Sequence, residues 1–110
     1  MGGFFLLITM NRRTHTCGEL TSTNISEKVS LNGWVNAVRF HGQVVFVDIR
    51  DRYGKTQIVY DQESFKGDFE LVKKLSMEDV LSVMGVVQKR DKNAINPNIA
   101  TGEVEVVISD

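Results

Sequence analysis

The chain has 110 residues, of which 42% are hydrophobic and 25% are charged. This length suits one domain with one modest hydrophobic core, and the composition is that of a folded protein. A separate catalytic domain of the usual size does not fit. The formal net charge of −1 argues against a protein that holds nucleic acid mainly by neutralising phosphates, but it leaves room for a local basic surface.

The cysteine content and the amino-terminal region exclude several further features. Cys17 is the single cysteine, so no disulfide can form within the chain, and with two histidines the common zinc sites are not expected. The apolar run at residues 4–8 is too short to cross a bilayer, so no membrane association is expected. We predict that residues 1–11 form a disordered amino-terminal extension and that residues 12–110 form the domain.

Three β-strands are predicted in the first half of the chain. Residues 29–40 are rich in β-branched and aromatic side chains, and Gly33 predicts a bulge or bend within this one long strand. A glycine-containing turn leads to a second strand over residues 44–50. A hairpin loop at residues 51–55 then leads to a third strand over residues 56–60.

A helix and two further strands are predicted in the second half. Apolar residues at helical spacing indicate an amphipathic helix over residues 64–75. Residues 80–89 are again strand-like, with Gly85 as a predicted bulge. After a polar loop at residues 90–102, the alternation of apolar and polar residues predicts a strand over residues 103–109.

The order of these elements predicts the fold. Five strands with a helix between the third and the fourth is the connectivity of the OB-fold, a mostly β Greek-key barrel. The helix is expected to cover one end of the barrel, which explains its apolar stripe. The alternative is another small barrel, such as an SH3-like one, but such barrels rarely have an amphipathic helix at this position.

The second predicted strand has one apolar side and one mixed side. Because side chains alternate along a strand, Phe46 shares its side with Asp48 and Arg50. An aromatic ring on a polar sheet face can stack on a nucleic acid base. The pattern alone leaves open whether Phe46 stacks on a base, belongs to the core or is covered by a loop. The opposite, apolar side is formed by Val45, Val47 and Ile49.

Two other side chains are candidates for contacts with RNA. Arg39 ends the long first strand, where it can donate to a phosphate or a base edge. Gln57 carries an amide that can read a Watson–Crick edge, although a solvent-facing strand position is the alternative. Most other basic residues fit a solvated surface. The histidines and carboxylates form no catalytic constellation, so no catalytic residues are predicted.

Several motifs, in order and at consistent spacing, resemble those of bacterial-type aspartyl-tRNA synthetases. The resemblance covers about residues 12–110 and departs from the family at one point, since members often carry a run of arginines where Ala37 and Val38 precede Arg39. The motifs are RTHTCGEL at residues 13–20, GWVN at 33–36, FVDIRDRYG at 46–54, Gln57, the Arg-Asp pair at 90–91 and ATGEVEV at 100–106.

The resemblance implies an OB-fold that binds the anticodon loop of a tRNA. It matches Phe46 to an aromatic residue that stacks on the middle anticodon base and Gln57 to the amide that reads this base. Arg39 matches a basic residue that contacts the anticodon. Asn96 and Glu105 match polar positions near the first anticodon base.

The resemblance also implies a larger enzyme. Family members are cytoplasmic, homodimeric class II ligases that join aspartate to its tRNA with ATP and magnesium, in a catalytic domain expected beyond Asp110. This chain alone is therefore expected to be non-catalytic and to bind no cofactor or metal. Two alternatives remain: a general OB-fold module for single-stranded nucleic acid, sugars or a protein, and a related synthetase for asparagine or lysine. The stretches at residues 17–20 and 101–103 favour aspartate.

Overall fold

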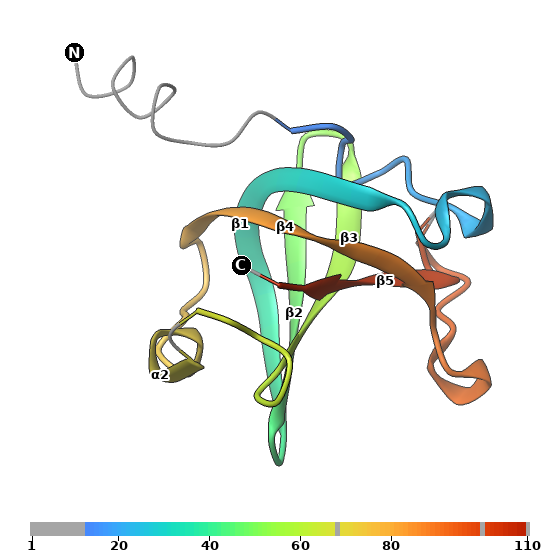
Figure 1. The fold of residues 1–110 in the computed structure, drawn as a ribbon. Coiled ribbons are helices and arrows are strands. Elements are labelled where there is room, and N and C mark those ends of the chain that lie inside the picture. The colour runs from blue at the N-terminus through green and yellow to red at the C-terminus, as the bar shows by residue number, and fades with distance from the viewer. Residues whose placement is uncertain (1–12, 68, 100, 110) are drawn as a thin grey trace.

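The computed structural model describes residues 13–67, 69–99 and 101–109, so the predicted extension at residues 1–11 lies outside the described residues. Within them lie five strands, one short α-helix and two short 3-10 helices (Figure 1). The strands are β1 (Lys28–His41), β2 (Val44–Asp51), β3 (Gly54–Asp61), β4 (Val80–Lys89) and β5 (Val104–Ile108). The helices are η1 (Ser22–Asn24), α2 (Phe69–Val72) and η2 (Lys92–Ala94).

The strands close into a barrel in the order β1-β2-β3-β5-β4. Neighbouring strands pair antiparallel, except β3 and β5, which pair in parallel. The ring closes because β4 also pairs with the first half of β1. Five strands with the helix between the third and the fourth confirm the predicted OB-fold connectivity.

β1 is a single long strand, as predicted, and it serves two neighbours in turn. Its first half pairs with β4 up to Trp34, and its second half pairs with β2. The register with β2 shifts between Val35 and Ala37, so the bulge lies beyond Gly33. Of the predicted bulge or bend at Gly33, the bulge is therefore wrong, whereas β1 does change its partner strand at the next residue, Trp34. Gly33 is needed for a different reason, because a Cβ atom there would lie 2.7 Å from the Arg50 carbonyl oxygen.

The interior of the barrel is filled with aliphatic side chains. Val45, Val47 and Ile49 of β2 are each at most 1% exposed, which confirms the predicted apolar side of this strand. Leu20, from the segment before β1, and Val72, from α2, pack against the same core. Fully burying one such side chain stabilises the fold by about 1.5–3 kcal/mol. The other side of β2 is therefore left to form the molecular surface.

The helix is shorter than the spacing of apolar residues predicted. α2 covers Phe69–Val72, and the preceding residues form a turn in which the amide groups of Ser64 and Phe65 donate to the Asp61 carbonyl oxygen. The Phe65 ring still reaches the core, because it meets the Tyr60 ring edge-on at 4.9 Å between centroids. No helix among the described residues has the length and apolar character needed to cross a membrane.

Gly85 does not form the predicted bulge. β4 pairs with β1 and with β5 in an unbroken register through this position. A Cβ atom on Gly85 would instead collide with the Val107 carbonyl oxygen of β5. Both strand glycines thus allow a close approach between strands, a role that a sequence cannot distinguish from a bulge.

Candidate nucleic-acid interface

The outward-facing residues of β2 and β3 carry a groove of about 620 Å³. The register of the two strands sets Asp48 opposite Gln57, and Phe46 lies two residues before Asp48 on the same side of β2. The loop between β4 and β5 borders the groove. The lining residues are Arg39, His41, Val44, Phe46, Asp48, Lys55, Gln57, Arg90, Ala94, Asn96 and Ile99.

Phe46 lies outside the barrel interior. It is half-buried, lines the groove and is absent from the core cluster of described residues, in contrast to its neighbours Val45 and Val47. Its ring meets the His41 ring nearly at right angles, with 5.4 Å between centroids. Phe46 therefore belongs to the outer face of the sheet and not to the barrel core, which removes one of the alternatives that the sequence pattern left open.

Gln57 is the centre of a hydrogen-bond network that spans three strands. Its Oε1 atom accepts hydrogen bonds from Arg39 Nη2 at 2.7 Å and from Arg90 Nη1 at 3.4 Å. Its Nε2 atom donates to Glu105 Oε1 at 2.9 Å. Gln57 is only 4% exposed, so it is not the solvent-facing strand residue that the pattern allowed as an alternative.

The charged groups of this network hold one another in place. The Arg39 guanidinium donates to both carboxylate oxygens of Asp48, at 3.2 and 3.5 Å, and to Gln57. Glu105 uses its second oxygen to accept from Gln88 Nε2 at 2.8 Å. Arg39, Asp48, Gln57, Gln88 and Glu105 each come from a different strand, so the pairing of the five strands fixes the positions of these polar groups.

Arg90 belongs to this network, although the sequence did not single it out as a binding residue. It is 6% exposed, and its Nε atom donates to the Val104 carbonyl oxygen at 2.9 Å. Burial lowers its pKa, while the carboxylates of Asp48 and Glu105 act in the opposite direction. Its Nη2 atom is buried without a hydrogen-bond partner among the described residues. The Arg-Asp pair in the family-like motif at residues 90–91 was the available signal.

Four of the five predicted RNA-binding residues line the groove: Arg39, Phe46, Gln57 and Asn96. Asn96 comes from the loop between β4 and β5, where its Oδ1 atom accepts from the Asn98 amide at 3.0 Å. The fifth, Glu105, is 9% exposed and does not line the groove, but its carboxylate accepts a hydrogen bond from the Gln57 amide, which does. The described residues contain no group of three or more side chains suited to hold a metal ion.

A closed five-stranded barrel with an aromatic ring, amides and guanidinium groups in a groove over β2 and β3 is an OB-fold with the surface that this class uses to bind oligonucleotides. The sequence agrees with this class. The tRNA anti-codon family, described as an OB-fold nucleic acid binding domain, matches residues 29–110, and the chain belongs to this family.

Individual relatives are aminoacyl-tRNA ligases. The aspartate–tRNA(Asp/Asn) ligase of Thermotoga maritima is 53% identical over 95 residues, or 86% of this chain and 16% of that protein. That of Salinibacter ruber is 47% identical over 98 residues, or 89% of this chain and 16% of that protein. The crystal structure of asparaginyl-tRNA synthetase from Pyrococcus horikoshii with asparaginyl-adenylate superposes with a TM-score of 0.75 at 29% identity, covering 92% of this chain and 22% of that one. The chain thus spans about 16% of the length of these curated relatives.

Proposed function

We propose that this chain is the anticodon-recognition part of an aspartate–tRNA ligase and that its groove binds the anticodon loop of an aspartate tRNA. Membership of the tRNA anti-codon family and the names of the similar ligases support this proposal. The outward position of Phe46 carries it, because a ring enclosed in the barrel interior cannot stack on a base.

In this proposal, Phe46 provides the stacking platform for the middle base. Base–aromatic stacking contributes about 1–3 kcal/mol per base and tolerates any base. The selection of one base therefore has to come from polar groups beside the ring. Gln57 lies opposite Asp48, and Phe46 lies two residues before Asp48 on β2, a distance along the strand of about 7 Å. That spacing is compatible with one base in contact with both Phe46 and Gln57.

Gln57 has one group left for reading a base. Its oxygen already accepts from Arg39 and Arg90, and one of its N–H groups donates to Glu105. The second N–H has no partner among the described residues and suits a carbonyl acceptor on a base edge. We assign to Glu105 the role of orienting the Gln57 amide through this hydrogen bond.

The remaining predicted residues surround this reading position. Arg39 is oriented by Asp48 and Gln57, and its guanidinium is suited to donate to a phosphate or a base edge. Asn96 lines the same groove from the loop between β4 and β5. We assign it to the first anticodon base.

We further propose that the parent protein is a cytoplasmic, homodimeric ligase that charges tRNA with aspartate. ATP and magnesium would supply the activation of the amino acid, and the described residues offer no carboxylate cluster to hold the metal. We therefore assign that chemistry to other parts of the parent enzyme. Aminoacylation assays of the complete protein with aspartate, asparagine and lysine test this assignment, and charging of lysine or asparagine instead of aspartate would contradict it.

The substitution Phe46→Ala tests the proposed site. It removes the stacking surface and should weaken binding of an aspartate-tRNA anticodon stem-loop by more than tenfold, as measured by fluorescence anisotropy. Phe40→Ala is the matched control, because Phe40 is an exposed phenylalanine of the same hairpin that does not line the groove. Equal binding by the wild-type protein and the Phe46 variant would remove Phe46 from the site.

A general OB-fold module is the competing function, motivated by the near-neutral net charge and by Ala37 and Val38 in place of arginines. Competition with stem-loops that differ in the middle anticodon base separates the two functions. A reader of the anticodon should prefer the cognate base. Equal competition by every loop would instead support a module without base selection.

A further inference from the structure

A second groove of about 360 Å³ continues the first one toward the β2–β3 turn. Two residues, Lys55 and Ile99, line both grooves, so the two hollows adjoin. The second groove is otherwise lined by Gly18, Arg50, Tyr53 and Gly54. None of these residues is used in the recognition of the anticodon bases proposed above.

The second groove concentrates positive charge that the fold does not neutralise. Arg50 of β2 lies directly opposite Lys55 of β3, and like charges in such a pair destabilise a sheet. In the part of the chain that the structure describes, Arg50 and Lys55, which line this groove, and Arg52, which lies in the adjoining turn, form no ion pair. Arg39 in the first groove differs, since Asp48 holds it at 3.2 Å. A cross-strand cation pair without a carboxylate is favourable once an anion lies between the two side chains.

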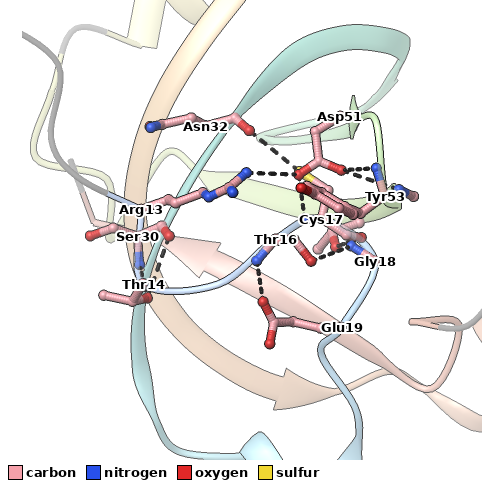
Figure 2. Close-up of polar contacts among 12 residues, drawn as sticks. Arg13, Thr14, Thr16, Cys17, Gly18, Glu19, Ser30, Asn32, Asp51 and Tyr53 are labelled. Carbon is pink, nitrogen blue, oxygen red and sulfur yellow. Dashed lines mark hydrogen bonds and ion pairs between the residues drawn. The ribbon is translucent and has the colours of Figure 1, made fainter. Parts of the chain in front are cut away.

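The turn between the two strands that carry Arg50 and Lys55 is held by one buried carboxylate. Asp51 is 7% exposed, and its Oδ1 atom accepts from the amides of Tyr53 and Gly54 at 2.8 and 3.1 Å. Its Oδ2 atom accepts from the Cys17 amide at 2.8 Å (Figure 2). The negative charge of Asp51 is thereby turned inward, and the cationic side chains project from a fixed base.

Tyr53 adds an aromatic surface to this cationic turn. It is 56% exposed, and the guanidinium groups of Arg13 and Arg52 lie 5.3 and 5.6 Å from the centre of its ring. Figure 2 shows Arg13 and Tyr53 on either side of Asp51, next to the segment that carries Cys17 and Gly18. Arginines clustered around an exposed aromatic ring are typical of surfaces that follow a nucleic acid backbone.

We propose that this second groove binds the sugar–phosphate backbone of the RNA nucleotides that flank those in the first groove. The proposal rests on the proposed function and extends it, because it needs an RNA strand in the first groove. The Arg50–Lys55 pair follows the Asp48–Gln57 pair on the same outer face of the sheet, two residues further along. A strand leaving the base-reading groove in this direction therefore meets these cations next.

The double substitution Arg50→Gln and Arg52→Gln tests this proposal on the whole 110-residue chain. Both side chains are exposed, so the fold is expected to tolerate the change. The charge-matched control is Lys66→Gln with Lys74→Gln, two exposed lysines near α2, which lies at the other end of the barrel from the β2–β3 turn (Figure 1). The ligands are a trinucleotide of the anticodon and the same triplet extended by three nucleotides on its 5′ side or on its 3′ side, titrated by NMR at several salt concentrations.

The wild-type chain should bind one extended RNA more tightly than the trinucleotide. The Arg50 and Arg52 double variant should lose about tenfold in affinity for that RNA. If two phosphate contacts are lost, the slope of the logarithm of the binding constant against the logarithm of the salt concentration should become shallower by about 1.4. Its affinity for the trinucleotide and its preference for the middle base should match those of the lysine control.

Three other outcomes have distinct meanings. Failure of the wild-type chain to bind any of the RNAs would overturn the proposed function itself. If the wild-type chain binds normally and the arginine and lysine variants lose affinity equally, the proposed role of the second groove is wrong. The proposed anticodon site is then unaffected. An equal loss for the trinucleotide and the extended RNA would show that the arginines act on the first groove, which also overturns this proposal.

Discussion

At the scale of single residues, Gln57 shows how much of the polar network in the groove depends on one side chain. It joins Arg39 and Arg90 on its oxygen and Glu105 on its nitrogen, and it is almost completely buried. A neutral amide can accept from the two guanidiniums and donate to the carboxylate at the same time, which an ionised carboxylate cannot do. The identity of this residue therefore matters for stability as well as for the proposed recognition of a base.

The substitution Gln57→Glu should destabilise the protein. It replaces the N–H that faces Glu105 by a second carboxylate oxygen, so two buried carboxylates would have to share a site. We expect the free energy of unfolding, measured with urea, to fall by about 1–3 kcal/mol. Gln88→Glu is the matched control, since Gln88 donates to the other oxygen of the same carboxylate but is exposed. Equal losses in both variants would show that burial of the Gln57 contact contributes nothing.

At the scale of an element, β1 determines the shape of the barrel. Fourteen residues pair first with β4 and then with β2, with the register shift between Val35 and Ala37. Gly33 lies just before the change of partner, where the Arg50 carbonyl carbon and Cys17 Sγ would each be 3.2 Å from an added Cβ atom. The crossing of three chain segments at this point leaves no room for a side chain.

The substitution Gly33→Ala should therefore be costly. The added Cβ atom would lie 2.7 Å from the Arg50 carbonyl oxygen, and backbone atoms cannot yield cheaply. We expect a loss of about 1–3 kcal/mol in the free energy of unfolding. Gly42→Asn is the comparison: φ at Gly42 is +61°, which asparagine tolerates, and no atom lies within 4 Å of an added Cβ. A loss at Gly33 no larger than at Gly42 would contradict the close approach.

At the scale of the whole molecule, the barrel interior holds two groups that ionise at high pH. Burial, helped by the carboxylate of Asp51, raises the pKa of the Cys17 thiol from its usual 9.0 to about 12. Burial also raises the pKa of Tyr60 from 10.0 to about 12. Both groups are neutral when protonated, so the folded state retains protons that the unfolded chain releases at lower pH.

The stability of the protein should consequently fall in alkaline solution. Below pH 9 both groups are protonated in the folded and unfolded states, and their contribution is fully present. As the pH rises from 9 toward 12, the unfolded chain ionises first and the free energy of unfolding decreases. Urea unfolding at pH 8, 10 and 11 measures this slope, and Cys17→Ala should reduce it. An unchanged slope in that variant would exclude the thiol as a cause.

The order of the elements and the two sides of β2 could be predicted from the sequence. Local rules suffice there, because side chains alternate along a strand whatever its neighbours are, and Val45 and Val47 could bury only if Phe46 pointed the other way. The resemblance to a synthetase family then selected Phe46 and Gln57 from among several polar and aromatic candidates.

The contacts within the groove were decided by the tertiary structure alone. Gln57 and Glu105 are 48 residues apart in the chain, and Gln57 and Arg90 are 33 apart, so no local pattern relates them. The same holds for Gly33 and Gly85. Each lies where the backbone of an adjacent strand approaches closely, and neither forms the bulge considered from the sequence. Sequence periodicity reports which way a side chain points, whereas its partners depend on which strands the closed barrel sets side by side.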